Sequence, residues 1–177
     1  MGARRFWTIA VLPACSLFTA SATVLYVDVN STNPIVPYTN WSTATTVIQD
    51  AIDAASAGDE IMVTNGVYTT GGRVAASSLV TNRVLVDKSV TLRSANGASF
   101  TTILGYQVPG TIYGNQAIRA VYLTSGAVLD GFTVSNGACV PSFVISFEDY
   151  KGGGVYCAST SEMVANCVIS GGFASKK

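Results

Sequence analysis

The sequence contains no histidine, and this absence removes a large part of enzyme chemistry. Histidine is the side chain that most often acts as a general base, and it is the commonest metal ligand. No Ser-His or Cys-His nucleophilic pair can therefore form, and no G-x-S-x-G motif is present. We expect no resident cofactor, with calcium as the exception if the chain belongs to a lyase.

Charge is also scarce. The chain has 10 basic and 10 acidic residues, so charged residues make up 11% of the sequence and the net charge is zero. A surface that binds nucleic acid needs clustered basic residues, which this sequence does not have. We therefore expect no nucleic-acid partner.

Long apolar runs are absent after residue 22. Before it, Arg4 and Arg5 precede a mostly apolar segment over residues 6–18, and Ala20-Ser21-Ala22 matches a signal-peptidase cleavage site. This pattern predicts a signal peptide over residues 1–22 and a secreted or cell-surface protein that begins at Thr23. The alternative is an uncleaved anchor, but the apolar run is shorter than the ~20 residues of a spanning helix.

Cysteine is rare in the expected mature chain. Only Cys139, Cys157 and Cys167 remain, and their odd number leaves at least one of them free. None has the C-x-x-C spacing of a metal site. We expect them to act as small buried apolar residues within stacked strands rather than as a disulfide pair.

A strand closed by an Asn-Gly corner is present at residues 129–137, where Phe132 and Val134 share one face. The corner occurs at Asn65, Asn96 and Asn136, and in degenerate form near Gly171. A unit that recurs about every 35 residues is typical of a solenoid. In parallel strands, the three asparagines would stack as a ladder. The alternative is that Asn-Gly marks hairpin turns in an antiparallel protein.

Aligning the corners predicts which side chains fill the interior of the coil. The two columns nearest the corners are Ile61, Leu92, Phe132 and Cys167, and Val63, Ser94, Val134 and Ile169. A third column places residues 120–123 over residues 154–157. One amphipathic helix, predicted over residues 45–55, precedes the strands and is expected to cover the first end of the stack.

The segments around Trp41, residues 48–55, residues 58–63 and residues 66–68 resemble the start of right-handed parallel β-helix proteins in the pectate-lyase-like superfamily. Residues 129–134 and 152–157 resemble the coil repeats of large secreted bacterial members. The resemblance implies an all-β, right-handed parallel β-helix (solenoid) of about four turns over residues 23–177, with an N-terminal capping α-helix. Because members run for more turns, we expect a fragment of a longer protein. Its uncapped C-terminal end would favour self-association.

Catalytic members of that superfamily act through carboxylates on an outer sheet face, which hold calcium or work as an acid–base pair. In this sequence, Asp87 and Asp130 could form such a patch with Arg93 or Arg119, although strand-end surface charges are the simpler interpretation. The best binding candidate is a loop in which aromatic residues flank an acidic pair. Its candidate binding residues are Phe147, Glu148, Asp149 and Tyr150. The catalytic residues stay unknown.

The sequence thus favours a secreted structural or binding module that contacts extracellular polysaccharide. Two alternatives stay open. One is a polysaccharide lyase or glycoside hydrolase of the pectate-lyase-like group whose active turns lie outside this chain. The other is a bacterial surface adhesin, which differs from the structural or binding module mainly by carrying an anchor.

Overall fold

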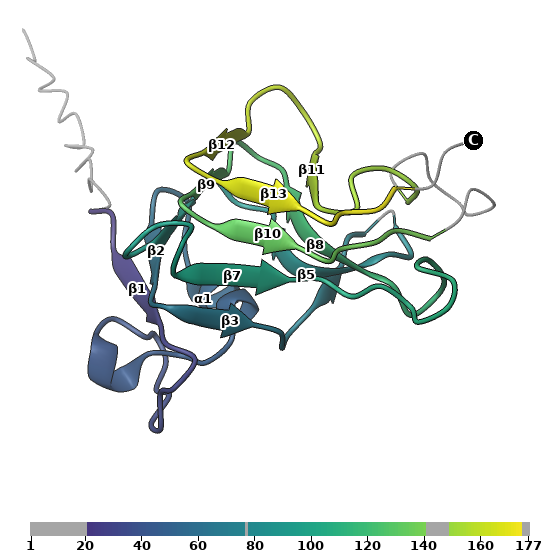
Figure 1. The fold of residues 1–177 in the computed structure, drawn as a ribbon. Coiled ribbons are helices and arrows are strands. Elements are labelled where there is room, and N and C mark those ends of the chain that lie inside the picture. Colours follow the sequence, from purple (N-terminus) through teal and green to yellow (C-terminus); the bar gives the residue numbers. More distant parts are fainter. Residues whose placement is uncertain (1–20, 77, 141–148, 175–177) are drawn as a thin grey trace, which may run out of the picture.

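The computed structural model describes residues 21–76, 78–140 and 149–174, and these residues form a parallel β-solenoid of about four turns (Figure 1). The fold class predicted from the repeat is confirmed, because all but one of the strand pairs are parallel. The first strand begins at Val24, directly after the expected cleavage position. The predicted signal peptide lies almost wholly outside the described residues.

Each turn of the coil contributes strands to three sheets. Sheet A contains β1 (Val24–Val27), β2 (Glu60–Val63), β6 (Thr91–Ser94), β9 (Val128–Asp130) and β12 (Met163–Ala165). Sheet B contains β3 (Gly66–Tyr68), β7 (Thr101–Leu104), β10 (Thr133–Ser135) and β13 (Val168–Ser170), which are stacked in front in Figure 1. Sheet C contains β4 (Arg73–Val74), β5 (Thr81–Val86), β8 (Ile118–Leu123) and β11 (Val155–Cys157), where β4 is antiparallel to β5.

The stretch over residues 128–135, which the alternation predicts as one strand, is two strands. Gly131 separates β9 from β10 with a φ of +79°, a left-handed conformation that glycine adopts without steric cost. Phe132 follows in the corner and is fully buried. Asn166, with a φ of 51°, divides β12 from β13 in the same way. Short strands joined by single left-handed residues let the chain turn between sheets A and B.

This division corrects the predicted interior columns. Leu92 pairs in register with Ile61 on one side and with Leu129 on the other, so Leu129 rather than Phe132 continues that column. Val134 pairs with Ile169 as expected, but their column belongs to sheet B. The predicted column of residues 120–123 over 154–157 is confirmed, because Val121, Tyr122 and Leu123 pair in register with β11.

The asparagine corners fall into two groups. Asn96 Nδ2 donates to Asn65 Oδ1 at 2.7 Å, as an asparagine ladder requires. Asn136 does not continue this ladder, because it follows β10 at the corner between sheets B and C. It has a φ of 54°, and the next residue must be glycine, since a Cβ on Gly137 would lie 2.0 Å from the carbonyl oxygen of Gly153. The predicted alignment of all three asparagines is therefore corrected.

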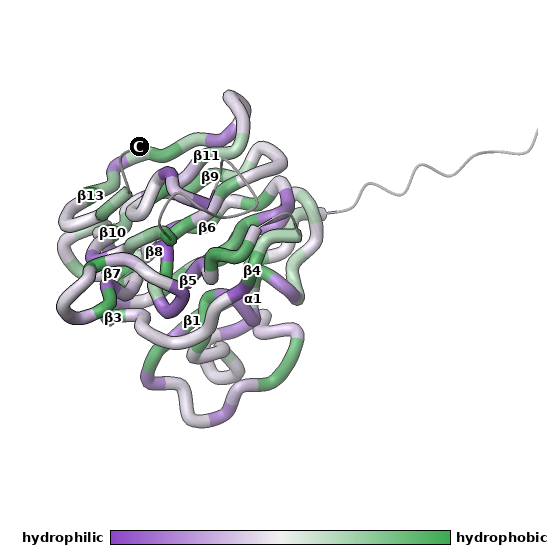
Figure 2. Tube along the Cα trace, turned by 90° about the vertical axis from the view of Figure 1, so that its right-hand side faces the viewer, coloured by the Kyte–Doolittle hydropathy of each residue, from purple (hydrophilic) through white to green (hydrophobic). Residues whose placement is uncertain are grey.

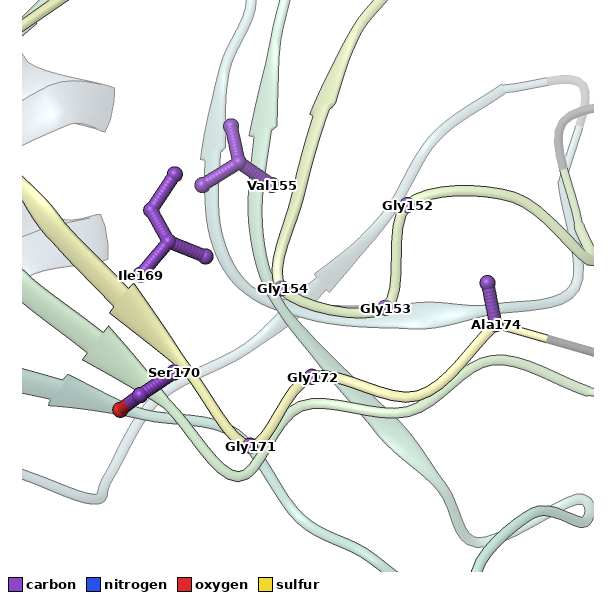
Figure 3. Close-up of a pocket in the computed structure, with 9 residues that line it drawn as sticks. All are labelled: Gly152, Gly153, Gly154, Val155, Ile169, Ser170, Gly171, Gly172 and Ala174. Atoms are coloured by element: carbon purple, nitrogen blue, oxygen red, sulfur yellow. The ribbon is translucent and has the colours of Figure 1, made fainter.

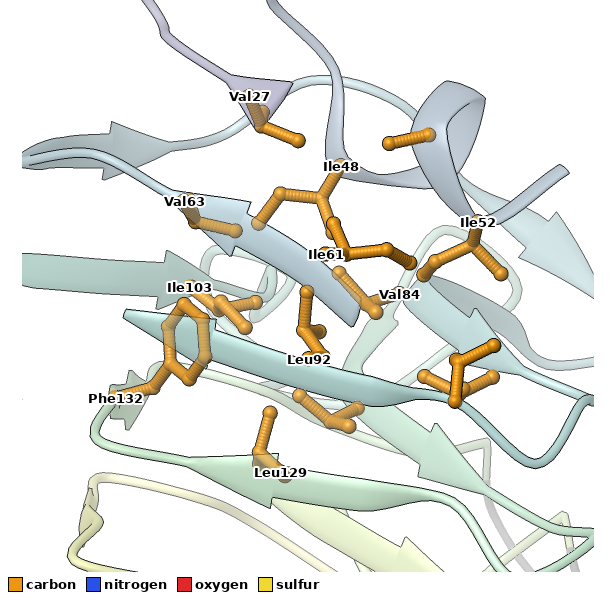
Figure 4. Packing of buried hydrophobic residues seen from close by; sticks show 14 of the residues in the cluster. Val27, Ile48, Ile52, Ile61, Val63, Val84, Leu92, Ile103, Leu129 and Phe132 are labelled. Carbon is orange, nitrogen blue, oxygen red and sulfur yellow. The ribbon is translucent and has the colours of Figure 1, made fainter. Parts of the chain in front are cut away.

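The interior of the coil is a continuous apolar core. Side chains from the three sheets point toward one another in Figure 4, among them Ile61, Leu92, Ile103 and Leu129, all fully buried. Parallel strands buried in this way favour β-branched and leucine residues. Figure 2 shows hydrophobic stretches in the region of β5 and β8, where Val84 to Val86 and the matching residues of β8 are also buried.

The first end of the coil is covered by the predicted helix, which is shorter than expected. Helix α1 (Ile48–Ala54) packs on β5, β1 and β2, and buries Ile48, Ala51 and Ile52 as its apolar stripe predicts. The N-cap residue of the helix is Val47, whose side chain makes no capping hydrogen bond. It ends at Ala54, before Gly58, where Lys88 Nζ donates to the carbonyl oxygens of Ile52, Asp53 and Ala55 at 2.7–2.9 Å.

Gln49 on α1 gives this cover its polar contacts. Its side-chain oxygen accepts from Leu85 N at 2.8 Å, and its side-chain nitrogen donates to Leu85 O at 3.2 Å. The backbone N–H and C=O of Leu85 both face away from β8, so without Gln49 they would be unpaired on the edge of sheet C. The amide of Gln49 therefore replaces the missing neighbouring strand.

The last described turn has no such cover. Met163, Val164, Val168 and Ile169 are 37–57% exposed, although equivalent residues of the preceding turns are buried or half-buried. A cavity of about 380 Å³ opens there. Figure 3 shows Val155 and Ile169 facing it, beside the glycines that precede β11 and those that follow β13. Among the described residues, the two ends of the coil thus differ: one is capped and the other presents strand edges.

Candidate functional site: the outer face of sheet A

The outer face of sheet A carries a line of side chains from successive turns. Because alternate residues of a strand point to opposite faces, Leu25, Ile61 and Leu92 face the core while their neighbours face outward. The outward residues in register are Tyr26, Met62, Arg93, Asp130 and Ala165. Neighbouring parallel strands lie ~4.8 Å apart, so these side chains form a compact column.

A polar stripe crosses this face, and we define it as Glu60, Arg93, Asp130 and Asn166. Arg93 Nε lies 3.3 Å from Glu60 Oε1 and 3.3 Å from Asp130 Oδ2. Asn166 Nδ2 donates to Asp130 Oδ1 at 2.7 Å. One guanidinium therefore bridges carboxylates from the turns on either side of it. Arg93 is the most exposed of the three charged side chains, at 48%.

An aromatic pair stands at the first end of the same face. The rings of Tyr26 and Trp41 pack with their centroids 4.4 Å apart, and Trp41 stays 45% exposed. Trp41 begins the short 3₁₀ helix η1 (Trp41–Thr43), whose start is capped by Asn40 Oδ1 accepting from Thr43 N at 3.1 Å. Thr45 N donates to Tyr26 O, and this hydrogen bond joins the segment after η1 to β1. These contacts hold the indole ring against the tyrosine before any ligand binds.

The stripe combines three charged groups and one amide from four turns of the coil. Asp130 and Arg93 were candidate partners, and the structure brings them together. It also adds Glu60 and Asn166, which sequence reasoning missed because no motif relates four residues on four turns. Asp87 and Arg119 lie elsewhere: Asp87 is exposed at the end of β5, and Arg119 is buried.

The carboxylates of the stripe are already engaged with cationic or amide donors. Their free lone pairs can accept hydrogen bonds from hydroxyl groups, and the guanidinium can donate. Within the described residues, no group of three or more His, Cys, Asp or Glu side chains is arranged to hold a metal ion. The chemistry available on this face is therefore hydrogen bonding beside an exposed aromatic surface.

The loop predicted as a binding site lies only partly within the described residues. Phe147 and Glu148 fall outside them. Asp149 is fully buried, and its Oδ1 accepts from Ser78 Oγ at 2.5 Å and from Leu79 N at 3.2 Å. Tyr150 is half-buried. The carboxylate of Asp149 thus anchors the chain to the segment before β5, and a binding role for this loop stays a prediction.

Arg119 secures the return of that loop. Its guanidinium donates to Asn82 Oδ1 at 2.9 Å, to Lys151 O at 2.9 Å and to Gly152 O at 3.1 Å. It also lies 5.1 Å from the centre of the Tyr156 ring. A fully buried arginine that holds two backbone carbonyls positions the start of β11.

The cysteines differ in their surroundings. Cys139 is buried, as expected, and donates from Sγ to Lys151 O at 3.0 Å; burial raises the pKa of its thiol. Cys167 is half-buried under Phe132. Cys157 is exposed, which corrects the expectation that all three are buried. All three are free thiols, so the coil is held together by its packing and hydrogen bonds.

No protein-family model matches this sequence, and no curated protein or solved structure is significantly similar to it. The described residues include no helix of sufficient length and hydrophobicity to cross a bilayer. The class of the protein therefore follows from its architecture: it is a parallel β-solenoid protein with an aromatic pair and a polar stripe on one outer face.

Proposed function

We propose that this chain is a secreted β-solenoid module that binds extracellular polysaccharide through the outer face of sheet A. The observation that carries the proposal is the exposed Trp41 ring, held by Tyr26, in line with the polar stripe. An aromatic ring offers an apolar face on which a sugar ring can stack, and the stripe offers donors and acceptors for its hydroxyl groups. A polymer of repeating units can meet such groups on successive turns.

The origin of the protein belongs to the same proposal. The resemblance to secreted bacterial members of the pectate-lyase-like superfamily supports it, and so does the signal-peptide pattern before Thr23. The described solenoid fold agrees with the architecture that this resemblance implies.

Affinity electrophoresis tests the binding. The native protein would be run through gels that contain polygalacturonate, xylan or amylose, and its retardation measured. We expect at least one polymer to retard it, and Trp41→Ala to weaken binding by about tenfold, which corresponds to the ~1.4 kcal/mol of a good aromatic contact. Phe100→Ala is the matched control, because Phe100 is 57% exposed but lies in the turn before β7.

A second variant separates the stripe from the aromatic pair. Arg93→Ala removes the only cation of the stripe, so Glu60 and Asp130 lose their cationic partner. We expect it to weaken binding of an acidic polymer more than binding of a neutral one. If the wild type passes all three gels unretarded, or if Trp41→Ala behaves as Phe100→Ala does, this face does not bind polysaccharide.

The alternative function is a polysaccharide lyase or glycoside hydrolase whose active turns lie outside this chain. The Glu60–Arg93–Asp130 contact favours it, because it places acidic and basic groups on adjacent turns of an outer face. Calcium would then be the expected cofactor of a lyase. Incubation of the native protein with the retarding polymer, with and without calcium, distinguishes the two. New unsaturated or reducing ends would indicate cleavage, whereas an unchanged polymer supports the binding module.

The second partner that we propose is another copy of this chain, bound through the exposed end of the coil. Strands β12 and β13 each have a pairing partner on one side only, and their apolar side chains are exposed. An uncovered strand edge is a template for pairing with another strand. A second copy of this chain presents the same edges, so two copies can cover each other end to end.

A further inference from the structure

Asp59 holds the beginning of the described chain. Its Oδ1 accepts from Thr23 N at 2.8 Å, and its Oδ2 accepts from Ser56 N at 2.7 Å. The side chain is buried, with about 9% of the residue exposed. The neighbouring residue Glu60 donates from its backbone N to Thr23 O at 2.9 Å, which aligns β1 beside β2. Thr23 is therefore fixed on both sides of its α-carbon.

The same nitrogen is the group that the predicted cleavage would release. Hydrolysis after Ala22 breaks the amide bond between the Ala22 carbonyl carbon and Thr23 N. The oxygen of the attacking water ends in the Ala22 carboxylate, and both of its protons end on Thr23 N, which becomes an ammonium group. A signal peptidase is the class of enzyme that catalyses this step.

We propose that the Asp59 carboxylate is a preformed site for the α-ammonium group of Thr23 in the processed protein. Cleavage converts an amide–carboxylate hydrogen bond into a charge-assisted one, which is shorter and stronger. A cavity of about 220 Å³, lined by Ser21 to Thr23 and by Ser56 to Asp59, adjoins the bond and leaves room for the additional protons. The inference rests on the proposed secretion of the chain and does not depend on polysaccharide binding.

The test measures how reactive the terminal amine is in the folded protein. A host would secrete the chain with residues 1–22 as its leader, and intact mass would identify the first residue of the product. The native protein would then be labelled by reductive methylation, and the rate at Thr23 measured by mass spectrometry. We expect Asp59→Asn to raise that rate about fivefold, because a well-formed ion pair lowers the population of free amine by about that factor.

Two comparisons make the result specific. Asp87→Asn is the matched control, since Asp87 is an exposed aspartate at a strand end, and it should label at the wild-type rate. A protein that keeps Ser21 and Ala22 places its amine two residues away from Asp59. It should label at the faster rate with Asp59 intact, so the proposal stays testable if Asp59→Asn does not fold.

Four outcomes would overturn the inference. A secreted protein that begins at a residue other than Thr23 has no ammonium group at Asp59. Equal labelling of the wild type and Asp59→Asn shows that the carboxylate does not hold the amine, as does slow labelling of the protein that keeps Ser21 and Ala22. Failure to find any cleavage would refute secretion as well, whereas cleavage at another site leaves the rest of the proposed function standing.

Discussion

Replacing Gln49 by leucine tests whether α1 closes the first end of the coil through its amide. The change replaces the amide by an apolar side chain of similar size and removes both contacts with Leu85. The N–H and C=O of Leu85 are then left on a buried strand edge, since Leu85 is 4% exposed. Each buried polar group without a partner costs ~1–3 kcal/mol, so losing two partners should lower the free energy of unfolding by about 2–6 kcal/mol.

Urea unfolding followed by circular dichroism measures this change. A domain of this kind is stable by ~5–15 kcal/mol, so the midpoint should move well outside experimental error, while the slope stays unchanged. Gln116→Leu is the control: Gln116 is exposed, and its replacement should change stability by less than about 0.5 kcal/mol. Gln49→Glu retains an acceptor for Leu85 N but loses the donor to Leu85 O, and it places a second carboxylate near Asp53. It should be destabilised as well.

The reasoning is refuted if Gln49→Leu and Gln116→Leu unfold at the same urea concentration. That result would mean that water reaches Leu85, and that the apolar stripe of α1 alone covers the coil.

Two further predictions concern the alkaline range and the exposed end. Burial raises the pKa of Tyr68 to about 12 from its ordinary value of 10.0, so folding favours the neutral phenol, which donates to Thr64 O at 3.1 Å. The stabilisation is complete below pH 10 and is lost as the pH rises from about 10 to about 12; Tyr68→Phe should remove this part of the pH dependence in thermal unfolding, and an unchanged profile would contradict it. Ile169→Lys places a charge on the uncovered end, so sedimentation velocity should show fewer dimers than for the wild type, whereas Ile35→Lys, a change at an equally exposed isoleucine of the first loop, should not. Equal dimer content in both variants, or a wild type without dimers, would refute association through this end.

The approximate repeat was sufficient to predict a parallel solenoid, because alternating apolar residues at a period of about 35 can be buried together only if successive turns stack. The apolar stripe of α1 was readable for a similar reason: Ile48, Ala51 and Ile52 share one face at helical spacing, and all three are buried. The match of Tyr122 with Tyr156 was also visible, since the segments around them are alike.

The position of each Asn-Gly corner in the coil was harder to predict from the sequence. Asn-Gly marks a position of left-handed backbone. Such positions occur after strands of sheet A and also after strands of sheet B, so the motif does not say which corner it occupies. Asn65 and Asn96 lie after sheet A, whereas Asn136 lies after sheet B. Leu129 therefore took the column that Phe132 was expected to fill.

By itself, the sequence determined the local choices: strand, corner and helix, and which face of each strand is apolar. These follow from backbone conformation and from side-chain period, which act over a few residues. The tertiary structure decided which residues of different turns meet. Glu60, Arg93 and Asp130 are far apart in the chain, and they touch because hydrogen bonds between neighbouring strands set the register of each turn on the one before it. That register depends on the length of every loop between the strands, and no local pattern encodes it.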